Sequence, residues 1–219
     1  MDKREILIQR LKAPFQASEL EFRPGSTRKS GKEAKPVGYV DTRAVNQRLG
    51  RVLGVGNYDV KLPILIMGED TYGAYTWENG QKKKVGENKG LLVGCSVSIE
   101  VHHPELKMVV SNVGEKSLDE SGYNKCTSAY AQAFKRAAGQ LGVGEYIYSL
   151  DLDWTSCNNG SLGEYTAPDD AIEDALIKAG FESKCEVTGQ KVPWKWAARS
   201  MRYYGMVLCE EEQKKLLGK

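Results

Sequence analysis

Apolar residues recur at helical spacing along residues 125–144, and this is the clearest pattern in the chain. Lys135 and Arg136 lie off the apolar face, and Gly142 stands where the helix is expected to end. We therefore expect a buried helix that carries a basic edge. The residues that share its apolar face are Cys126, Tyr130, Phe134, Ala137, Ala138 and Leu141.

Three segments before this helix show the alternation of β-strands. Apolar and polar residues alternate over residues 57–67 and 91–101, and residues 107–113 form a weaker third strand. Pro63 makes the first strand an edge or bulged one, because proline lacks the N–H that a central strand donates. Residues 68–90 are expected to form a protruding hairpin or a long loop between the first two strands.

Two helices are predicted near the start of the chain. Residues 2–11 place apolar side chains at helical spacing, and Asp41 is a suitable N-cap for a second helix that carries Arg43 on a polar face. Residues 23–36 lie between these helices and are rich in Gly, Ser and Lys, so we expect a mobile loop there. The order of elements predicts an α+β fold, with a three-stranded antiparallel sheet, a β-β-β-α core and flanking helices.

Charge divides the chain into three parts. Residues 1–150 hold 22 basic and 17 acidic residues, residues 151–182 hold one basic and eight acidic, and residues 183–219 hold eight basic and four acidic. We interpret these parts as a core domain, an acidic linker with one short helix, and a small basic and aromatic module. This distribution suits a polyanionic partner.

Few side chains are suited to catalysis or to metal binding. The chain has two histidines, and they are adjacent at His102 and His103, which leaves little material for a catalytic imidazole or a metal cluster. The five cysteines are widely spaced and odd in number, so we expect reduced thiols. No apolar run resembles a signal peptide or a membrane span. We expect a cytoplasmic protein that is not an enzyme and needs no cofactor.

The last part of the chain resembles a treble-clef or ribbon zinc finger that has lost its metal. Cys185 and Cys209 stand where a zinc knuckle has two Cys-x-x-Cys pairs, but the second cysteine of each pair is missing. Structural zinc takes four nitrogen or sulfur ligands, so no metal is expected in this degenerate module. Its small core is expected to consist of aromatic residues, namely Trp194, Trp196, Tyr203 and Tyr204.

Several short motifs, taken in order, resemble those of a known family. They are Lys12-Ala-Pro-Phe15, Tyr39-Val-Asp-Thr-Arg43 with Asn46, and Ala133-Phe-Lys-Arg-Ala137 followed by Leu141-Gly142. Together with the β-β-β-α order, they make residues 6 to about 150 similar to the Rad fifty-two and DdrA-type family of single-strand annealing proteins, of phage or bacterial type. The resemblance implies a homo-oligomeric ring or helical filament that binds single-stranded DNA in a positively charged groove. It also implies ATP-independent annealing in recombination or DNA repair.

The resemblance further implies which residues contact the phosphates of the strand. Arg43 matches an arginine near the start of the family's second helix, and Lys135 with Arg136 matches a Lys-Arg pair on its long helix. Where relatives carry another basic residue one helical turn later, this chain has Gly139, and no contact is carried over there. Three more basic residues complete the expected DNA-binding set, namely Arg48, Lys61 and Lys125.

A second group of basic residues lies outside these motifs. The lysine run in the hairpin is either part of a solvated loop or an arm that touches nucleic acid. In the tail, basic and aromatic residues alternate, which is typical of a surface that binds single strands or a protein partner such as another recombination protein. The candidate secondary DNA contacts are Lys82, Lys83, Lys84, Lys195, Arg199 and Arg202.

Two other functions compete with strand annealing. A double-stranded-RNA-binding module also has the order α-β-β-β-α, but the long hairpin and the Lys-Arg pair in the middle of the helix fit that module poorly. A metal-dependent nuclease would use carboxylates such as Asp151, Asp153 and Glu100, but no spacing commits two of them to one site.

Overall fold

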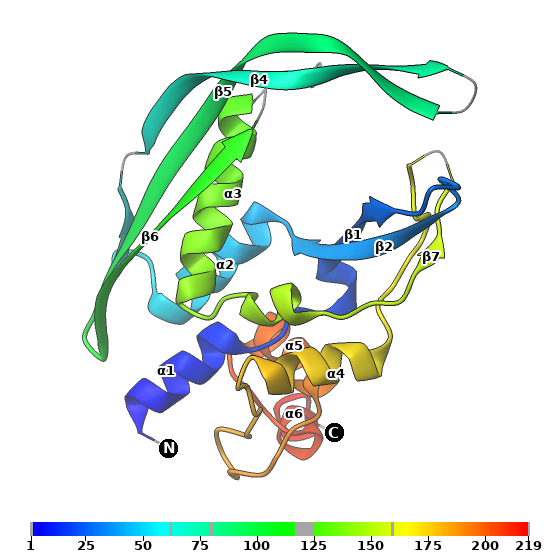
Figure 1. The fold of residues 1–219 in the computed structure, drawn as a ribbon. Coiled ribbons are helices and arrows are strands. Elements are labelled where there is room, and N and C mark those ends of the chain that lie inside the picture. The colour runs from blue at the N-terminus through cyan, green and yellow to red at the C-terminus, as the bar shows by residue number, and fades with distance from the viewer. Residues whose placement is uncertain (1, 62, 79–80, 117–124, 159, 219) are drawn as a thin grey trace. The chain divides into compact units, whose positions relative to one another are not determined.

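The computed structural model describes residues 2–218 apart from residues 62, 79–80, 117–124 and 159 (Figure 1). Helices and antiparallel sheets are both present, so the expected α+β class is confirmed. Short 3-10 turns occur at Ala17–Glu19 and Glu145–Ser149. The helices are α1 (Lys3–Lys12), α2 (Thr42–Leu53), α3 (Lys125–Gln140), α4 (Asp169–Lys178), α5 (Trp194–Tyr204) and α6 (Glu210–Leu216). The strands are β1 (Leu20–Thr27), β2 (Glu33–Val40), β3 (Tyr58–Val60), β4 (Ile64–Glu78), β5 (Gln81–His103), β6 (Leu106–Lys116) and β7 (Thr155–Ser156).

The chain folds into two compact units that do not follow the linear boundaries expected from its charge. The first unit consists of Met1–Asn57, His102–Lys107 and Ala138–Lys219, and the second of Tyr58–Val101 and Met108–Ala137. The tail expected to form a separate module therefore belongs to the same unit as α1 and α2. The acidic segment also packs, because α4 buries Ile172 and Leu176.

The second unit is built on the long strand β5. Strands β3, β4 and β6 all pair with it, so the described sheet has four strands rather than three. The expected first strand is divided around Pro63. Lys61 still donates its N–H to the Ser98 carbonyl at 2.9 Å, but the ladder resumes only with the pair Ile64 and Ser96. The hairpin between β4 and β5 is confirmed and pairs as far as Glu78 and Gln81.

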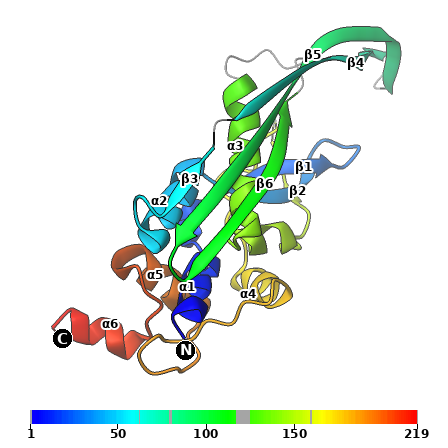
Figure 2. The same ribbon diagram turned by 90° about the vertical axis from the view of Figure 1, so that its left-hand side faces the viewer.

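Helix α3 lies along this sheet in both views (Figures 1 and 2). The close approach depends on Gly114 of β6, where an added Cβ would lie 2.3 Å from the Ala129 carbonyl oxygen and 2.6 Å from the Ala133 nitrogen. Both alanines are fully buried. Small residues on both sides thus let backbone approach backbone. The apolar face predicted for this helix is buried only in part: Phe134, Ala137 and Ala138 are buried, but Cys126 is exposed. The closest approach to the sheet is made by Ala129 and Ala133, which were not among the residues predicted for that face.

The first unit holds a second antiparallel sheet, formed by β1, β2 and β7. Leu20 pairs with Val40, and Glu33 at the other end of β2 pairs with Ser156. The expectation of a mobile loop over residues 23–36 is therefore wrong. Strand β1 is largely exposed and lacks the apolar alternation that marks a half-buried strand, whereas β2 buries Ala34, Pro36 and Val40. Backbone pairing forms this sheet where sequence pattern alone predicts a loop.

The tail packs against α1 through polar contacts. Arg10 forms an ion pair with Glu186 at 2.6 Å, and only 3% of the Glu186 side chain is exposed. Gln9 donates to the Lys184 carbonyl at 2.8 Å and accepts from the Lys184 N–H at 2.9 Å. These contacts give the tail one fixed position on α1 within the first unit.

In the zinc-finger-like part of the tail, as in the rest of the described chain, no group of three or more His, Cys, Asp or Glu side chains is placed to hold a metal ion. Cys185 and Cys209 are both buried. Burial raises the pKa of the Cys185 thiol, but hydrogen bonds from the Thr188 side chain and from the backbone of Cys209, Thr188 and Val187 outweigh it and lower this pKa to about 7. The backbone donors that surround Cys185 thus stabilise a thiolate. No helix in the described part of the chain is long and apolar enough to cross a membrane.

Candidate nucleic-acid interface

Arg43 stands in the first turn of α2. Asp41 caps this helix by accepting a hydrogen bond from the Arg43 N–H at 2.7 Å, which fixes the backbone of the turn. The Arg43 side chain is exposed, and no ion pair or hydrogen bond holds its guanidinium among the described residues. The start of the helix adds a positive electrostatic potential of its own. Arg43 therefore stands on a fixed backbone, and its exposed guanidinium is available to an anion.

Arg48 has a different environment, although it lies on the same helix. Its guanidinium donates to the carbonyls of Ala13 and Pro14, the latter at 3.1 Å, and lies 4.4 Å from the centre of the Phe15 ring. Burial lowers the pKa of Arg48 to about 10, so the group remains charged at neutral pH. With 7% of the residue exposed, Arg48 anchors α2 to the segment after α1 and is not a surface contact. We leave it out of the proposed DNA-binding residues.

The two basic residues expected on α3 are Lys135 and Arg136, and Arg136 also bonds to the protein backbone. Lys135 is half-buried, and Arg136 is exposed. The Arg136 Nη1 donates to the Val113 carbonyl of β6 at 2.9 Å, which holds the guanidinium at the surface of the second unit. A guanidinium has five N–H groups, so this one bond leaves donors for a phosphate. Arg43 belongs to the first unit, whereas Lys135 and Arg136 belong to the second.

Two other lysines expected to contact DNA already form ion pairs with carboxylates of the protein. Lys61 pairs with Glu100 at 2.7 Å and lies 3.9 Å from Asp59, and the hydrogen bond to Glu100 raises the pKa of this lysine. Lys84 pairs with Glu87 at 2.8 Å, and its neighbour Lys83 is exposed. The predictions for the Lys82 and Lys125 side chains lie outside the part of the structure that is described.

The basic residues expected in the tail share one face of α5. Lys195 forms an ion pair with Asp169. The Arg199 guanidinium lies 5.6 Å from the centre of the Trp196 ring, and Arg202 pairs with Glu19 at 2.5 Å. All three basic side chains are exposed to solvent.

The carboxylates weighed for a nuclease do not converge. Asp151 pairs with Lys35 at 2.8 Å in the first unit, whereas Glu100 pairs with Lys61 in the second. No cluster of three or more metal-ligating side chains occurs among the described residues. The described carboxylates therefore provide no assembled site for a catalytic metal.

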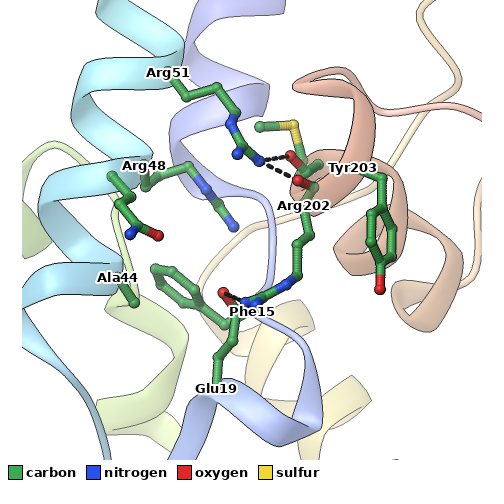
Figure 3. Close-up of a pocket in the computed structure, with 9 residues that line it drawn as sticks. Phe15, Glu19, Ala44, Arg48, Arg51, Arg202 and Tyr203 are labelled. Carbon is green, nitrogen blue, oxygen red and sulfur yellow. Dashed lines mark hydrogen bonds and ion pairs between the residues drawn. The ribbon is translucent and has the colours of Figure 1, made fainter.

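Sequence reasoning missed two groups of cations. In the β1–β2 hairpin, the Arg28 guanidinium lies 4.9 Å from the centre of the Trp154 ring, and the Arg23 guanidinium lies 4.4 Å from that of Tyr39. The basic composition of residues 23–36 is the signal for these cations, but the same composition is typical of a loop. Arg51 of α2 is the second omission, and it lines a pocket beside α5 (Figure 3). Its role depends on residues 150 positions away, which no local pattern reveals.

Comparisons with known proteins give distant relatives. No family model matches the chain. The single-stranded DNA-binding protein DdrA of Deinococcus deserti is 26% identical over 162 residues, which are 74% of this chain and 66% of that protein. The DdrA of Deinococcus radiodurans is 25% identical over 161 residues, which are 74% of this chain and 64% of that protein.

A third relative has a different name. It is the NADPH-dependent 7-cyano-7-deazaguanine reductase of Stenotrophomonas maltophilia, which is 25% identical over 173 residues, or 72% of this chain and 61% of the reductase. The chain spans slightly less than two thirds of the length of these relatives. Two of the three are named for single-stranded DNA binding and one for a reduction.

Proposed function

We propose that this protein binds single-stranded DNA and anneals complementary strands in recombination or DNA repair. The observation that carries the proposal is the exposed Arg43 guanidinium, which stands on a capped helix and is engaged by no described partner. Arg136, held at the surface by Val113, supplies a second oriented cation. The two relatives named for single-stranded DNA binding support DNA as the partner.

Annealing requires little chemistry of the protein. No bond is broken and no nucleotide is hydrolysed, but each strand must be held with its bases free to pair. Cations on rigid helices meet this need, because phosphate contacts position a nucleic acid without reading its sequence. We propose Arg43, Lys135 and Arg136 as the principal phosphate contacts. Binding of this kind weakens steeply with salt, because each contact releases counterions.

We further propose that the protein acts as a homo-oligomer, in a ring or a helical filament. Strand β4 lies at an edge of its sheet and exposes four consecutive apolar residues, which is unusual for a surface in water. Their exposed fractions are 66% for Ile64, 51% for Leu65, 56% for Ile66 and 66% for Met67. A second copy that pairs with this edge would cover them, and repeated subunits would multiply a few phosphate contacts into high avidity.

A competition experiment tests the function. The purified protein is mixed with a labelled single-stranded oligonucleotide and challenged with unlabelled single-stranded DNA or duplex RNA, and strand annealing is followed without ATP by fluorescence transfer between two labelled complements. We expect single-stranded DNA to compete better than duplex RNA and annealing to exceed the spontaneous rate. A preference for duplex RNA would favour the double-stranded-RNA-binding alternative. Sustained DNA cleavage in magnesium or manganese would favour the nuclease.

A further inference from the structure

Helix α5 carries a stripe of basic and aromatic side chains that the principal site does not use. Lys195, Arg199, Arg202 and Tyr203 are spaced as i, i+4, i+7 and i+8, so they share one face of the helix, and all four are exposed. Tyr203 is 66% exposed. Basic residues beside an exposed aromatic ring suit a chain that offers both phosphates and flat bases.

The stripe ends at a pocket between α5 and α2. The cavity has a volume of about 150 Å³, and Figure 3 shows the side chains around it. This volume is well below that of a usual small-molecule site, so the pocket suits one flat ring rather than a whole nucleotide. The lining residues are Phe15, Glu19, Ala44, Gln47, Arg48, Arg51, Met201, Arg202 and Tyr203.

The walls of the pocket are fixed by hydrogen bonds within the first unit. Arg51 of α2 donates to the carbonyls of Met201, at 2.9 Å, and of Arg202, and so joins α2 to the last turn of α5. Gly205 ends α5 with a φ of 70°, and a Cβ there would lie 3.3 Å from the Arg51 side chain. The Arg202–Glu19 ion pair closes a further side (Figure 3). The pocket is therefore preformed, so a ligand need not order it.

The pocket also adjoins the helix that carries Arg43. Arg43, Gln47 and Arg51 are spaced as i, i+4 and i+8, so the face of α2 that begins at Arg43 leads into the pocket. Three arginines and one glutamate line the cavity, which gives it a positive balance. A polyanion with flat ring groups matches this surface, because basic side chains lie beside the exposed ring of Tyr203.

We propose that the face formed by α5 and α2 extends the path of the single strand, with one base stacked on Tyr203 at the mouth of the pocket. Arg199 contacts a phosphate along α5, and Arg43 contacts one on α2. The seated base anchors the strand, while its neighbours remain free to pair. This inference rests on the proposed single-strand binding, and it gives the tail a role in it.

The test measures the affinity of the full-length protein for a labelled oligothymidylate by fluorescence anisotropy at several salt concentrations. Tyr203→Leu should weaken binding about tenfold, because base stacking on an aromatic ring is lost, whereas Tyr203→Phe should retain most of the affinity. Arg199→Ala should reduce the slope of log affinity against log salt by about 0.7. Arg4→Ala is the matched control, since Arg4 is exposed on α1 with no ion pair among the described residues.

A crosslinking experiment on the unaltered protein provides an independent readout. An oligonucleotide that carries 5-iodouracil is irradiated in the complex, and the attached peptide is identified by mass spectrometry, with Tyr203 as the expected site. If Tyr203→Leu and Arg199→Ala bind like the control while Arg43→Ala is weakened, the inference is overturned and the proposed function stands. Crosslinks that all lie outside α2 and α5 would also overturn it. If the unaltered protein does not bind the oligonucleotide, both proposals fail.

Discussion

Arg10 and Glu186 form a bidentate ion pair that joins the first helix of the chain to its tail. The Arg10 Nε and Nη2 both donate to the Glu186 carboxylate, at 3.0 and 2.6 Å, and the same carboxylate accepts the Val207 N–H at 2.7 Å. The carboxylate is almost fully buried, so water cannot take the place of its hydrogen-bond donors. These bonds therefore hold the tail against α1.

Removal of this carboxylate should loosen the tail. Glu186→Ala leaves the Arg10 guanidinium and the Val207 N–H without their acceptor, and we expect a loss of about 3 kcal/mol from the free energy of unfolding. Limited proteolysis should then release the tail faster than in the unaltered protein. Glu182→Ala is the control, since Glu182 is an exposed carboxylate of the same segment. Equal proteolysis of the two variants would contradict the role assigned to Glu186.

Substitution of Arg48 should lower the stability of the fold much more than substitution of Arg43. Arg48→Ala leaves the buried carbonyls of Ala13 and Pro14 without their donor, so we expect a loss of about 3 kcal/mol in stability by urea denaturation. Arg48→Lys should recover only part of it, because lysine lacks the planar fork that reaches both carbonyls. Arg43→Ala should change stability by less than about 0.5 kcal/mol. A stable Arg48→Ala variant would refute the anchoring role.

Loss of a principal DNA contact should make binding less dependent on salt concentration. Each of Arg43→Ala and Arg136→Ala removes one phosphate contact, so the slope of log affinity against log salt should fall by about 0.7. Affinity should fall similarly for different sequences, because phosphates carry no sequence information. The Arg4→Ala variant again serves as the control. An unchanged slope in a folded variant would remove that arginine from the site.

Oligomerisation should depend on the apolar edge of β4. Ile64→Lys with Ile66→Lys places two charges on that edge, so we expect a smaller mass by light scattering and weaker DNA binding through lost avidity. Val55→Lys is the matched control, because Val55 is 97% exposed in the first unit. If the double variant keeps the mass of the unaltered protein, another surface forms the oligomer.

Cys185 should make stability depend on pH. Its pKa in the folded protein is about 7, below that of a thiol in an unfolded chain. The thiolate therefore contributes stability that is fully present above the unfolded pKa and is lost as the pH falls through 7. We expect the unaltered protein to gain stability over Cys185→Ser between about pH 7 and pH 9. A constant difference across that range would show that the thiol stays protonated.

Local pattern determined much of the fold. The period of apolar residues located α2 and α3, alternation located β5 and β6, and Pro63 marked the interruption between β3 and β4. These features follow from interactions within a few residues, which a single sequence displays directly. The β1–β2 hairpin was not predicted, because β1 is largely exposed and the residues that β2 buries include Ala34 and Pro36, which are uncommon in strands.

The sequence alone therefore determined most of the helices and strands, and which lysines and arginines could contact DNA. Only the tertiary structure decided which cations face solvent. Arg43 and Arg48 lie on one helix and were expected to act alike, but Arg48 meets carbonyls of the segment after α1 and becomes buried, whereas Arg43 stays exposed. The tail likewise became part of the first unit through Arg10 and Arg51. Helical period fixes the direction of a side chain, but contacts with distant residues decide what it meets there.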